Sequence, residues 1–279
     1  MVLVRDESGL LVVMDLMNTM FTHISVISEN GFVMAFLIMS KTVSISNVVL
    51  AGMKVWGNIN HAYGQAAQGT KADSGFNGLW TGSNGMKFGA YVGFMESPDE
   101  ERNAYRQKTY GADGIKGNLG VMMQRLELNA AFFFTVPGPK MIWQSGELGY
   151  DISIEEGGRT GRKAPRWEYL DVPERKALYD TYCSLINFRR NNPEFFDETA
   201  SFSWKVGPND WDNGRFITCT AGAKSFVVVG NFTKEKKTIM AEMPSEGTWV
   251  NHFDSGDKYT GKNISVELPA GEFKLLINF

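Results

Sequence analysis

The densest group of acidic residues lies in the segment 94–102, which reads Phe-Met-Glu-Ser-Pro-Asp-Glu-Glu-Arg. An apolar run ends at Met95, and acidic side chains crowd the residues that follow it. In a parallel β/α barrel the active site lies at the carboxyl ends of the strands, so this is a suitable place for a catalytic acid. The alternative is that the acids begin a helix and only stabilise its dipole. The residue types leave both interpretations open.

The surrounding sequence predicts alternating strands and helices between residues 53 and 190. Three short apolar runs are typical of buried parallel strands: residues 54–59, 91–95 and 140–143. A helix is expected over Ile115–Phe134, and a second one from an Asp171 N-cap to Pro193. Strands that alternate with helices imply a parallel sheet with helical crossovers.

From about residue 193 onward the pattern changes to short alternating strands separated by Gly, Asn and Pro. Strands are expected at 201–205, 215–220, 225–231, 248–253, 264–268 and 273–279. The connections, including Ser255-Gly-Asp, have turn chemistry. We therefore expect two domains: a β/α part at 1–192, whose first 52 residues are atypical and poor in motifs, and an antiparallel β-sandwich at 193–279.

Charge and composition exclude several classes of protein. The chain has 28 Lys and Arg against 31 Asp and Glu, a net charge of −3, so it has no broad attraction for nucleic acid or acidic membranes. The longest apolar run, residues 32–39, is far shorter than the ~20 residues that span a bilayer. The N-terminus lacks the pattern of a secretory signal. A cytoplasmic protein without a membrane helix is expected.

The cysteines and histidines do not suggest a metal site. Cys183 and Cys219 match no metal-ligand or redox spacing, and two buried thiols are favoured over a disulfide. The histidines, His23, His61 and His252, are too scattered for a zinc site. No metal ligand is therefore assigned.

Several motifs taken together resemble the α-amylase family of glycoside hydrolases. The segment 93–102 looks like the seventh barrel strand of that family and the connection after it. Residues 56–63 (Trp-Gly-Asn-Ile-Asn-His-Ala-Tyr) are similar to its sixth-strand region, and residues 139–150 to its eighth. The resemblance covers residues 53–279 almost continuously, with several motifs in the right order.

The resemblance implies an eight-stranded parallel β/α TIM-type barrel followed by a small β-sandwich. A complete barrel takes about 250 residues, whereas roughly 190 precede the expected sandwich. The barrel is therefore expected to be incomplete, without room for its first three or four strands. Because unpaired strand edges invite association, we expect either self-association or a compensating pairing made by residues 1–52.

By resemblance, Asp99 corresponds to the acid of the strand-seven motif, which steadies the distorted sugar in this family. Pro98 stands where the family has a histidine, and a proline offers neither a side-chain donor nor a backbone N–H. Asp99 is therefore the candidate catalytic residue.

The nucleophile of the family has no match in this chain. Retaining glycosidases pair a carboxylate nucleophile with a carboxylic general acid ~5 Å away. In the strand-four pattern, Gly31-Phe32 and Lys41 fit the two ends. Between them, Phe36 stands at the arginine position and Ile38 at the nucleophile position, and an isoleucine cannot attack an anomeric carbon.

The general acid of the family should follow on the fifth strand. Between Glu29 and Glu96 the chain has no glutamate, and its one aspartate there, Asp73, lies in a turn sequence. No residue matches the general acid.

Four residues are candidates for substrate binding: Lys41, Trp56, Asn60 and His61. The last three sit at or beyond a strand end, where aromatic faces and amide donors suit an α-glucan. Packing in the core is the alternative for each of them. No cofactor is assigned, although the resemblance leaves room for calcium without indicating a set of ligands.

Three hypotheses follow. The first is an α-amylase-type glycoside hydrolase acting on α-1,4-glucans such as starch and maltooligosaccharides, truncated on its N-terminal side. The second is a non-catalytic α-glucan-binding remnant, which Ile38, Pro98 and the missing general acid favour. The third is an aberrant reading frame whose first 52 residues are not native amylase sequence.

Overall fold

The computed structural model describes residues 4–5, 11–15, 23–28, 31–33, 54–84 and 86–279. Its first four strands pair antiparallel in chain order: β1 (Val4–Arg5), β2 (Leu11–Asp15), β3 (His23–Ser28) and β4 (Gly31–Val33). Three positions of the expected strand-four pattern, Phe36, Ile38 and Lys41, lie outside the described residues.

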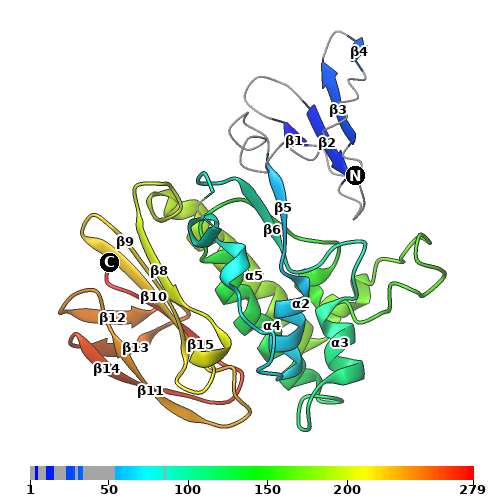
Figure 1. Ribbon diagram of the computed structural model, residues 1–279. Coiled ribbons are helices and arrows are strands. Elements are labelled where there is room, and N and C mark those ends of the chain that lie inside the picture. Colours follow the sequence, from blue (N-terminus) through cyan, green and yellow to red (C-terminus); the bar gives the residue numbers. More distant parts are fainter. Residues whose placement is uncertain (1–3, 6–10, 16–22, 29–30, 34–53, 85) are drawn as a thin grey trace.

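Three parallel strands form the sheet that the apolar runs predict (Figure 1). β5 (Val55–Asn58) pairs with β6 (Tyr91–Phe94), and β6 pairs with β7 (Lys140–Met141), in parallel in both cases. The prediction of adjacent parallel strands is confirmed. β7 is shorter than expected and ends at Met141, and Ile142, the next residue, is 42% exposed.

Helices connect these strands and follow them. α2 (Asn60–Gln68) lies between β5 and β6, α3 (Asn103–Tyr110) and α4 (Leu119–Phe134) lie between β6 and β7, and α5 (Pro173–Asn191) follows β7. Short 3₁₀ helices occupy the connections: η1 (Asn77–Leu79), η2 (Thr81–Asn84), η3 (Gly146–Leu148), η4 (Trp167–Asp171), η5 (Pro193–Phe195) and η6 (Pro208–Asp210). The alternation is the one that a parallel sheet with helical crossovers requires.

The helix expected from Ile115 begins later, at Leu119. Gly117 has a φ of 79°, in the left-handed region that a helix does not use. Asn118 then caps the helix, because its side-chain oxygen accepts a hydrogen bond from the Val121 N–H at 3.2 Å.

The expectation of Asp171 as the N-cap of α5 is wrong. Asp171 is the last residue of η4, and the N-cap is Val172, which makes no side-chain capping bond. Pro173 begins the helix instead, since its fixed φ suits the first turn and the helix needs no N–H there. The end is as predicted, with α5 stopping at Asn191, two residues before Pro193.

The C-terminal strands form two antiparallel sheets. One has the order β13-β12-β15-β10-β9-β8, and the other pairs β11 with β14. Their bounds are β8 (Ser201–Lys205), β9 (Arg215–Ala221), β10 (Lys224–Gly230), β11 (Lys237–Glu242), β12 (Thr248–Asn251), β13 (Asp254–Thr260), β14 (Asn263–Leu268) and β15 (Phe273–Ile277). β11 and β13 were not predicted, and Ser255-Gly-Asp, expected to be a turn, lies within β13.

The two sheets pack face to face through one apolar cluster. It contains residues of the six-stranded sheet and of the two-stranded sheet: Val227, Val229, Trp249 and Leu276 from the first, and Ile239, Ala241, Ile264, Val266 and Leu268 from the second. This packing is that of a β-sandwich.

The other face of the six-stranded sheet packs on the helices. Gly230 of β10 lies against Phe132 and Leu128 of α4, and a Cβ placed there would come within 2.4 Å and 2.8 Å of their side chains. Only glycine allows the sheet and the helix to approach this closely.

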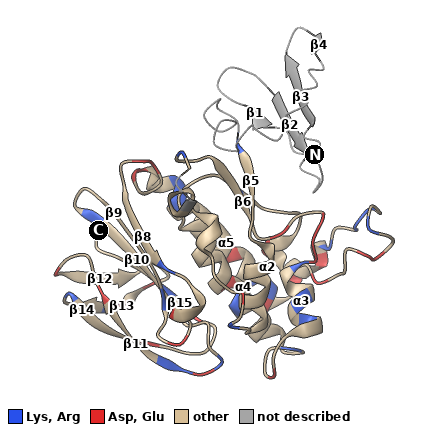
Figure 2. Cartoon of the chain, in the orientation of Figure 1, with Lys and Arg blue, Asp and Glu red and all other residues tan. Residues whose placement is uncertain are grey.

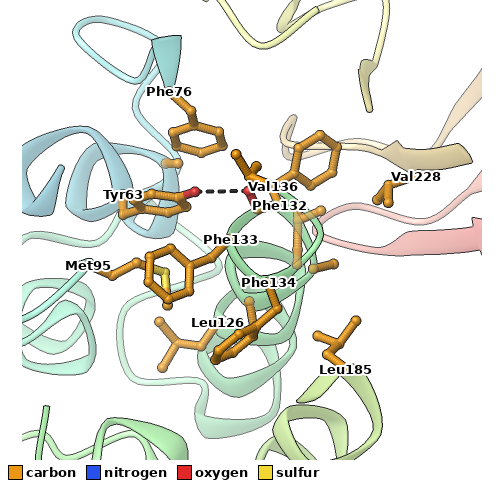
Figure 3. Packing of buried hydrophobic residues seen from close by; sticks show 14 of the residues in the cluster. Tyr63, Phe76, Met95, Leu126, Phe132, Phe133, Phe134, Val136, Leu185 and Val228 are labelled. Carbon is orange, nitrogen blue, oxygen red and sulfur yellow. Dashed lines mark hydrogen bonds between the residues drawn. The ribbon is translucent and has the colours of Figure 1, made fainter. Parts of the chain in front are cut away.

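Aromatic side chains fill the core between α2, α4 and the six-stranded sheet (Figure 3). Tyr63 stacks on Phe76 with ring centroids 4.2 Å apart, and its hydroxyl donates to the carbonyl oxygen of Phe132 at 3.0 Å. The buried hydroxyl therefore has a partner, which the packing of a tyrosine requires.

Arg125 of α4 holds three segments together and is 2% exposed. Its Nε and Nη2 donate to the carbonyl oxygens of Ala67 (3.0 Å) and Ala66 (2.7 Å) in the last turn of α2. Its Nη2 and Nη1 also donate to the carbonyl oxygens of Phe232 (2.9 Å) and Thr233 (3.3 Å), just after β10. Burial lowers the pKa of the guanidinium to about 10, so it stays charged at neutral pH.

Two further expectations concern cysteines and membranes. Neither Cys183 nor Cys219 forms a disulfide, and Cys219 is buried whereas Cys183 is half-buried. Among the residues described, no helix has the length and apolar character needed to cross a bilayer.

Replacing Arg125 by methionine should destabilise the fold. Methionine keeps much of the length of the side chain but removes four hydrogen bonds to buried carbonyl oxygens, at a cost of about 3 kcal/mol. The carbonyl oxygens of Ala66 and Ala67 keep a second donor, from the Gly69 N–H and from Gln107. Urea unfolding followed by tryptophan fluorescence measures the loss. Arg190→Met, at an exposed position of α5, is the control, and an equal effect of both substitutions would contradict the role given to Arg125.

Candidate functional site

Three connections leave the carboxyl ends of the parallel strands, and together we call them the strand-end rim: residues 58–61, 95–102 and 142–172. The third carries acidic and basic residues side by side on the loop that extends at the right of Figure 2. In α/β folds, ligand sites form at this end of the sheet. The candidate site is therefore built from the rim.

Asp99 lies exposed at the tip of the β6–α3 connection. Its N–H donates to the hydroxyl oxygen of Ser97 at 3.1 Å, and its carbonyl oxygen accepts from Nη2 of Arg159 at 2.5 Å. The backbone is thus fixed on both sides, while the side chain faces solvent next to the exposed Pro98.

The acids at 99–101 do not begin a helix, so the alternative that they stabilise a helix dipole from its first turn is wrong. α3 starts at Asn103 with Arg102 as N-cap, so Asp99, Glu100 and Glu101 all precede it. Glu96 takes the helix-terminal role instead, because its Oε1 accepts from the Asn103 N–H at 2.7 Å.

Glu96 is buried at the base of the rim. Its Oε2 lies 3.6 Å from Nη1 of Arg102, and Arg102 in turn lies over the rings of Trp143 and Tyr150. Burial raises the pKa of Glu96, although the charge of Arg102 and the Asn103 N–H act against that rise. Arg102 thus joins the β6–α3 and β7–α5 connections, and Glu96 holds Arg102 in place.

Glu101 ties the same two connections together nearer the surface. Its carboxylate accepts from the Ser153 hydroxyl at 2.6 Å and from the Ile154 N–H at 3.0 Å. With the bond from Arg159 to Asp99, three hydrogen bonds join residues 96–102 to the β7–α5 connection, in addition to the contacts of Arg102 with the two aromatic rings. The position of Asp99 therefore depends on that loop.

Asp151 fixes the loop to the helices behind it. It accepts from the Tyr169 hydroxyl at 2.6 Å and from Lys108 Nζ at 3.1 Å, and lies 3.3 Å from Nη2 of Arg175. Partial burial acts to raise the pKa of Asp151, but the Tyr169 hydrogen bond and the charge of Arg175 outweigh it and hold that pKa below 3.8. The carboxylate of Asp151 is therefore ionised in the folded protein at neutral pH.

Asn60, predicted to bind substrate, is 1% exposed. Its Nδ2 donates to the carbonyl oxygens of Met95 (2.8 Å) and Glu101 (3.2 Å), and its Oδ1 accepts from Nη2 of Arg106 at 3.1 Å. The amide links the ends of β5 and β6, so its part in the site is to hold the rim. A contact with substrate stays a prediction.

His61 and Trp56 lie in different surroundings. His61 is exposed in the first turn of α2, with Nε2 3.9 Å from Oδ2 of Asp73, a turn residue with a φ of 54°. Trp56 is half-buried on β5 and packs edge-to-face on Phe94 at 5.9 Å. His61 is therefore open to a ligand, and Trp56 is partly used in packing.

A hollow of about 470 Å³ opens at the ends of β5 and β6. It is lined by Asn58, Asn60, His61, Glu100 and Arg106 with Gly75 and Gly78. The structure therefore brings Asn60 and His61 together with Glu100, the neighbour of Asp99, whereas Trp56 is not part of the lining.

Sequence reasoning missed Asn58, Glu100 and Arg106 as lining residues. Glu100 accepts hydrogen bonds from Asn58 Nδ2 and from the Ser97 hydroxyl. Asn58 could have been found, because it lies next to the end of the strand predicted at 54–59. Arg106 gives no such signal, since it reaches the hollow only through the packing of α3 on α2.

The resemblance left a calcium site open, but the described residues do not provide a set of ligands for it. Across the described ranges, no group of three or more His, Cys, Asp or Glu side chains could hold a metal ion. We assign no step to a metal.

The chain thus has three adjacent parallel strands with crossover helices, polar connections at the carboxyl ends of these strands and a C-terminal β-sandwich. No family model matches the chain. It is 23% identical over 160 residues to a 1,4-alpha-glucan branching enzyme of Rhodopirellula baltica, a match that covers 54% of this chain and 21% of that enzyme.

Solved structures give the same result. An α-amylase of Anoxybacillus aligns with a TM-score of 0.59 at 13% identity, over 78% of this chain and 45% of that one. AmyP in complex with maltotriose aligns with a TM-score of 0.53 at 13% identity, over 67% of this chain and 41% of that one. The resemblance to the α-amylase family is confirmed, and the chain spans about a fifth of the curated relative and less than half of each solved chain.

Replacing Asp151 by asparagine should weaken the fold at neutral pH and have little effect in acid. A carboxylate whose folded pKa is lowered stabilises the fold above its unfolded value of 3.8, and this contribution disappears as the pH falls through the lower folded value. At pH 6 the loss should be about 2 kcal/mol, the scale of a charged hydrogen bond.

Urea unfolding of both proteins between pH 3 and pH 7 measures this difference. Asp113→Asn, an exposed acid between α3 and α4, is the control. A difference that stays constant down to pH 3 would contradict the ionic role of Asp151.

Proposed function

We propose that this chain is part of an α-amylase-type glycoside hydrolase that acts on α-1,4-glucans at the strand-end rim. The observation that carries the proposal is the placement of Asp99, which is exposed beyond the end of β6, is held by Ser97 and Arg159, and precedes Glu100 in the lining of the hollow of about 470 Å³. The curated relative is named for acting on 1,4-alpha-glucan, and the solved AmyP chain holds maltotriose.

The three parallel strands are consistent with one segment of a β/α barrel. We assign β5, β6 and β7 to the sixth, seventh and eighth strands of an eight-stranded barrel, with a first domain over 1–192 and the sandwich domain over 193–279. Among the described strands, β5 and β7 each keep one edge without a partner. Such edges would pair with further barrel strands or with a second copy of the chain.

Asp99 would stabilise the charge of the transition state electrostatically and would neither attack the sugar nor transfer a proton. Glycoside hydrolysis passes through an oxocarbenium-like transition state, so positive charge grows at the anomeric carbon. A carboxylate held at a fixed distance from that carbon stabilises this charge without reorganising. Ser97 and Arg159 fix the backbone of Asp99, and Glu101 fixes the loop that carries Arg159.

A second candidate is an α-glucan-binding protein without catalysis. Ile38 at the nucleophile position and Pro98 at the histidine position favour it, because neither side chain can supply a carboxylate or a hydrogen-bond donor. The hollow with Asn58, His61 and Glu100 would still offer polar partners to sugar hydroxyls.

Hydrolysis of soluble starch separates the two candidates. If the chain is an enzyme, Asp99→Asn should lower the release of reducing ends by about 100-fold or more, because charge stabilisation is often the largest catalytic contribution. Asp113→Asn should leave the rate unchanged.

Binding of maltoheptaose without turnover in the unmodified chain would establish the second candidate. Hydrolysis that Asp99→Asn leaves unchanged would show that the active site lies elsewhere.

A further inference from the structure

Glu127 is an acidic residue at the junction of α4, α5 and the C-terminal sandwich, and the proposed function does not use it. It is half-buried on α4, and its Oε2 accepts a hydrogen bond from the hydroxyl of Thr181 at 3.0 Å. Thr181 belongs to α5 and is 7% exposed. The carboxyl group therefore lies in the contact between the two helices.

The turn between β14 and β15 brings a second carboxylate to the same face of α4. Gln124 precedes Glu127 by three residues, so the two side chains are neighbours on the helix surface. The Gln124 amide donates at 2.6 Å to Oε1 of Glu272, the residue before β15. Glu272 is thus held one helical turn from Glu127, and the two carboxylates repel each other when both are ionised.

The turn that carries Glu272 is fixed against α4. Gly271 has a φ of 77°, and a Cβ placed on it would lie 2.9 Å from Cγ of Arg125. The Gly271 N–H donates to the carbonyl oxygen of Asn231 at 2.9 Å, and the Asn231 N–H donates to that of Glu272 at 2.9 Å. The turn therefore cannot withdraw from α4 without breaking backbone hydrogen bonds.

The basic groups of the two helices do not compensate the charge of Glu127. Arg125 is directed to the end of α2 and to the segment after β10. One turn beyond Thr181, the hydroxyl of Ser184 shares a hydrogen bond with Nε2 of His252 at 3.2 Å. Burial lowers the pKa of His252, so this imidazole is neutral at neutral pH.

The basic group of the sandwich nearest to Glu272 in the sequence also has its own partner. Lys274 Nζ lies 2.6 Å from Oδ2 of Asp257. In the described part of the chain, no cation contributes to the pKa of Glu127. Burial raises that pKa to about 7, the Thr181 hydrogen bond opposes the rise, and Glu272 adds to it.

We propose that Glu127 makes this junction sensitive to pH, so that the helices hold the sandwich more firmly when its carboxyl group is protonated than when it is ionised. A carboxyl group whose pKa is raised by folding stabilises the fold at low pH. This contribution is lost as the pH rises from the ordinary pKa of 4.5 through the folded value of about 7.

The junction also supports the strand-end rim. Arg175 of α5 donates from Nη1 to the carbonyl oxygen of Leu148 at 2.9 Å. A weaker seat for α5 would therefore loosen the β7–α5 connection above neutral pH as well.

Urea unfolding of the full chain and of Glu127→Gln at pH 5 and at pH 8 tests the proposal. Glutamine keeps the shape of the protonated carboxyl group and does not ionise. The ratio of the unfolding constant of the unmodified chain to that of the variant should rise about 50-fold from pH 5 to pH 8, as expected for these two pKa values. Glu246→Gln, at an exposed position of the sandwich, is the control and should leave the ratio constant.

Two further variants should move the titration of Glu127 in opposite directions. Glu272→Gln removes the like charge and should lower the pKa of Glu127, whereas Thr181→Val removes a hydrogen bond to the ionised form and should raise it. NMR titration of the Glu127 carboxyl carbon in the folded protein measures both shifts, and it keeps the test valid if Glu127→Gln fails to fold.

The contact with the sandwich itself is followed by hydrogen exchange. At pH 8 the Gly271 N–H should exchange faster in the unmodified chain than in Glu127→Gln, and this difference should be smaller at pH 5. An unfolding ratio that stays constant from pH 5 to pH 8, or a Glu127 carboxyl that titrates near 4.5, would overturn the proposal. Titration that Glu272→Gln leaves unchanged would show that the sandwich takes no part, and would overturn it as well.

Discussion

The packing of the helices on one another and on the C-terminal sheet depends on guanidinium groups that bond to carbonyl oxygens rather than to carboxylates. Arg125 bonds to the end of α2 and to the segment after β10. Arg189 of α5 donates to the carbonyl oxygens of Phe134, Val136 and Gly138, where α4 ends and the chain turns into β7. Helix ends leave carbonyl oxygens without intrahelical partners, and a long cationic donor can reach them from a neighbouring element.

Arg215 lies in the centre of the core and is surrounded mainly by aromatic rings. It is fully buried, with its guanidinium 4.7 Å from the ring centroids of both Phe76 and Phe232, and its Nη2 donates to Ser74 Oγ at 2.7 Å. An apolar side chain of similar size would leave the hydroxyl of Ser74 without this donor. The three arginines thus join the helices to one another and to the C-terminal sheet, and these helices support the strand-end rim.

Local pattern was enough to predict the elements whose apolar residues decide their structure. The three parallel strands were found because their runs are short and apolar, and the end of α5 because Pro193 stops a helix. β13 was missed because Asp254, Ser255, Gly256 and Asp257 have turn chemistry, which an edge strand of the sheet tolerates. The same holds for the candidate site. The acid cluster could be predicted from the sequence, whereas the structural role of Asn60 could not, because its amide bonds to carbonyl groups 35 and 41 residues away.

Pro98 has an effect beyond the hydrogen bonds it cannot make. A proline fixes its own φ and restricts the residue before it, so the segment 97–99 has fewer conformations available in the unbound protein. Less conformational entropy is then lost when a ligand orders this connection. Pro98 therefore lacks a hydrogen-bond donor and at the same time makes the connection that carries Asp99 more preorganised.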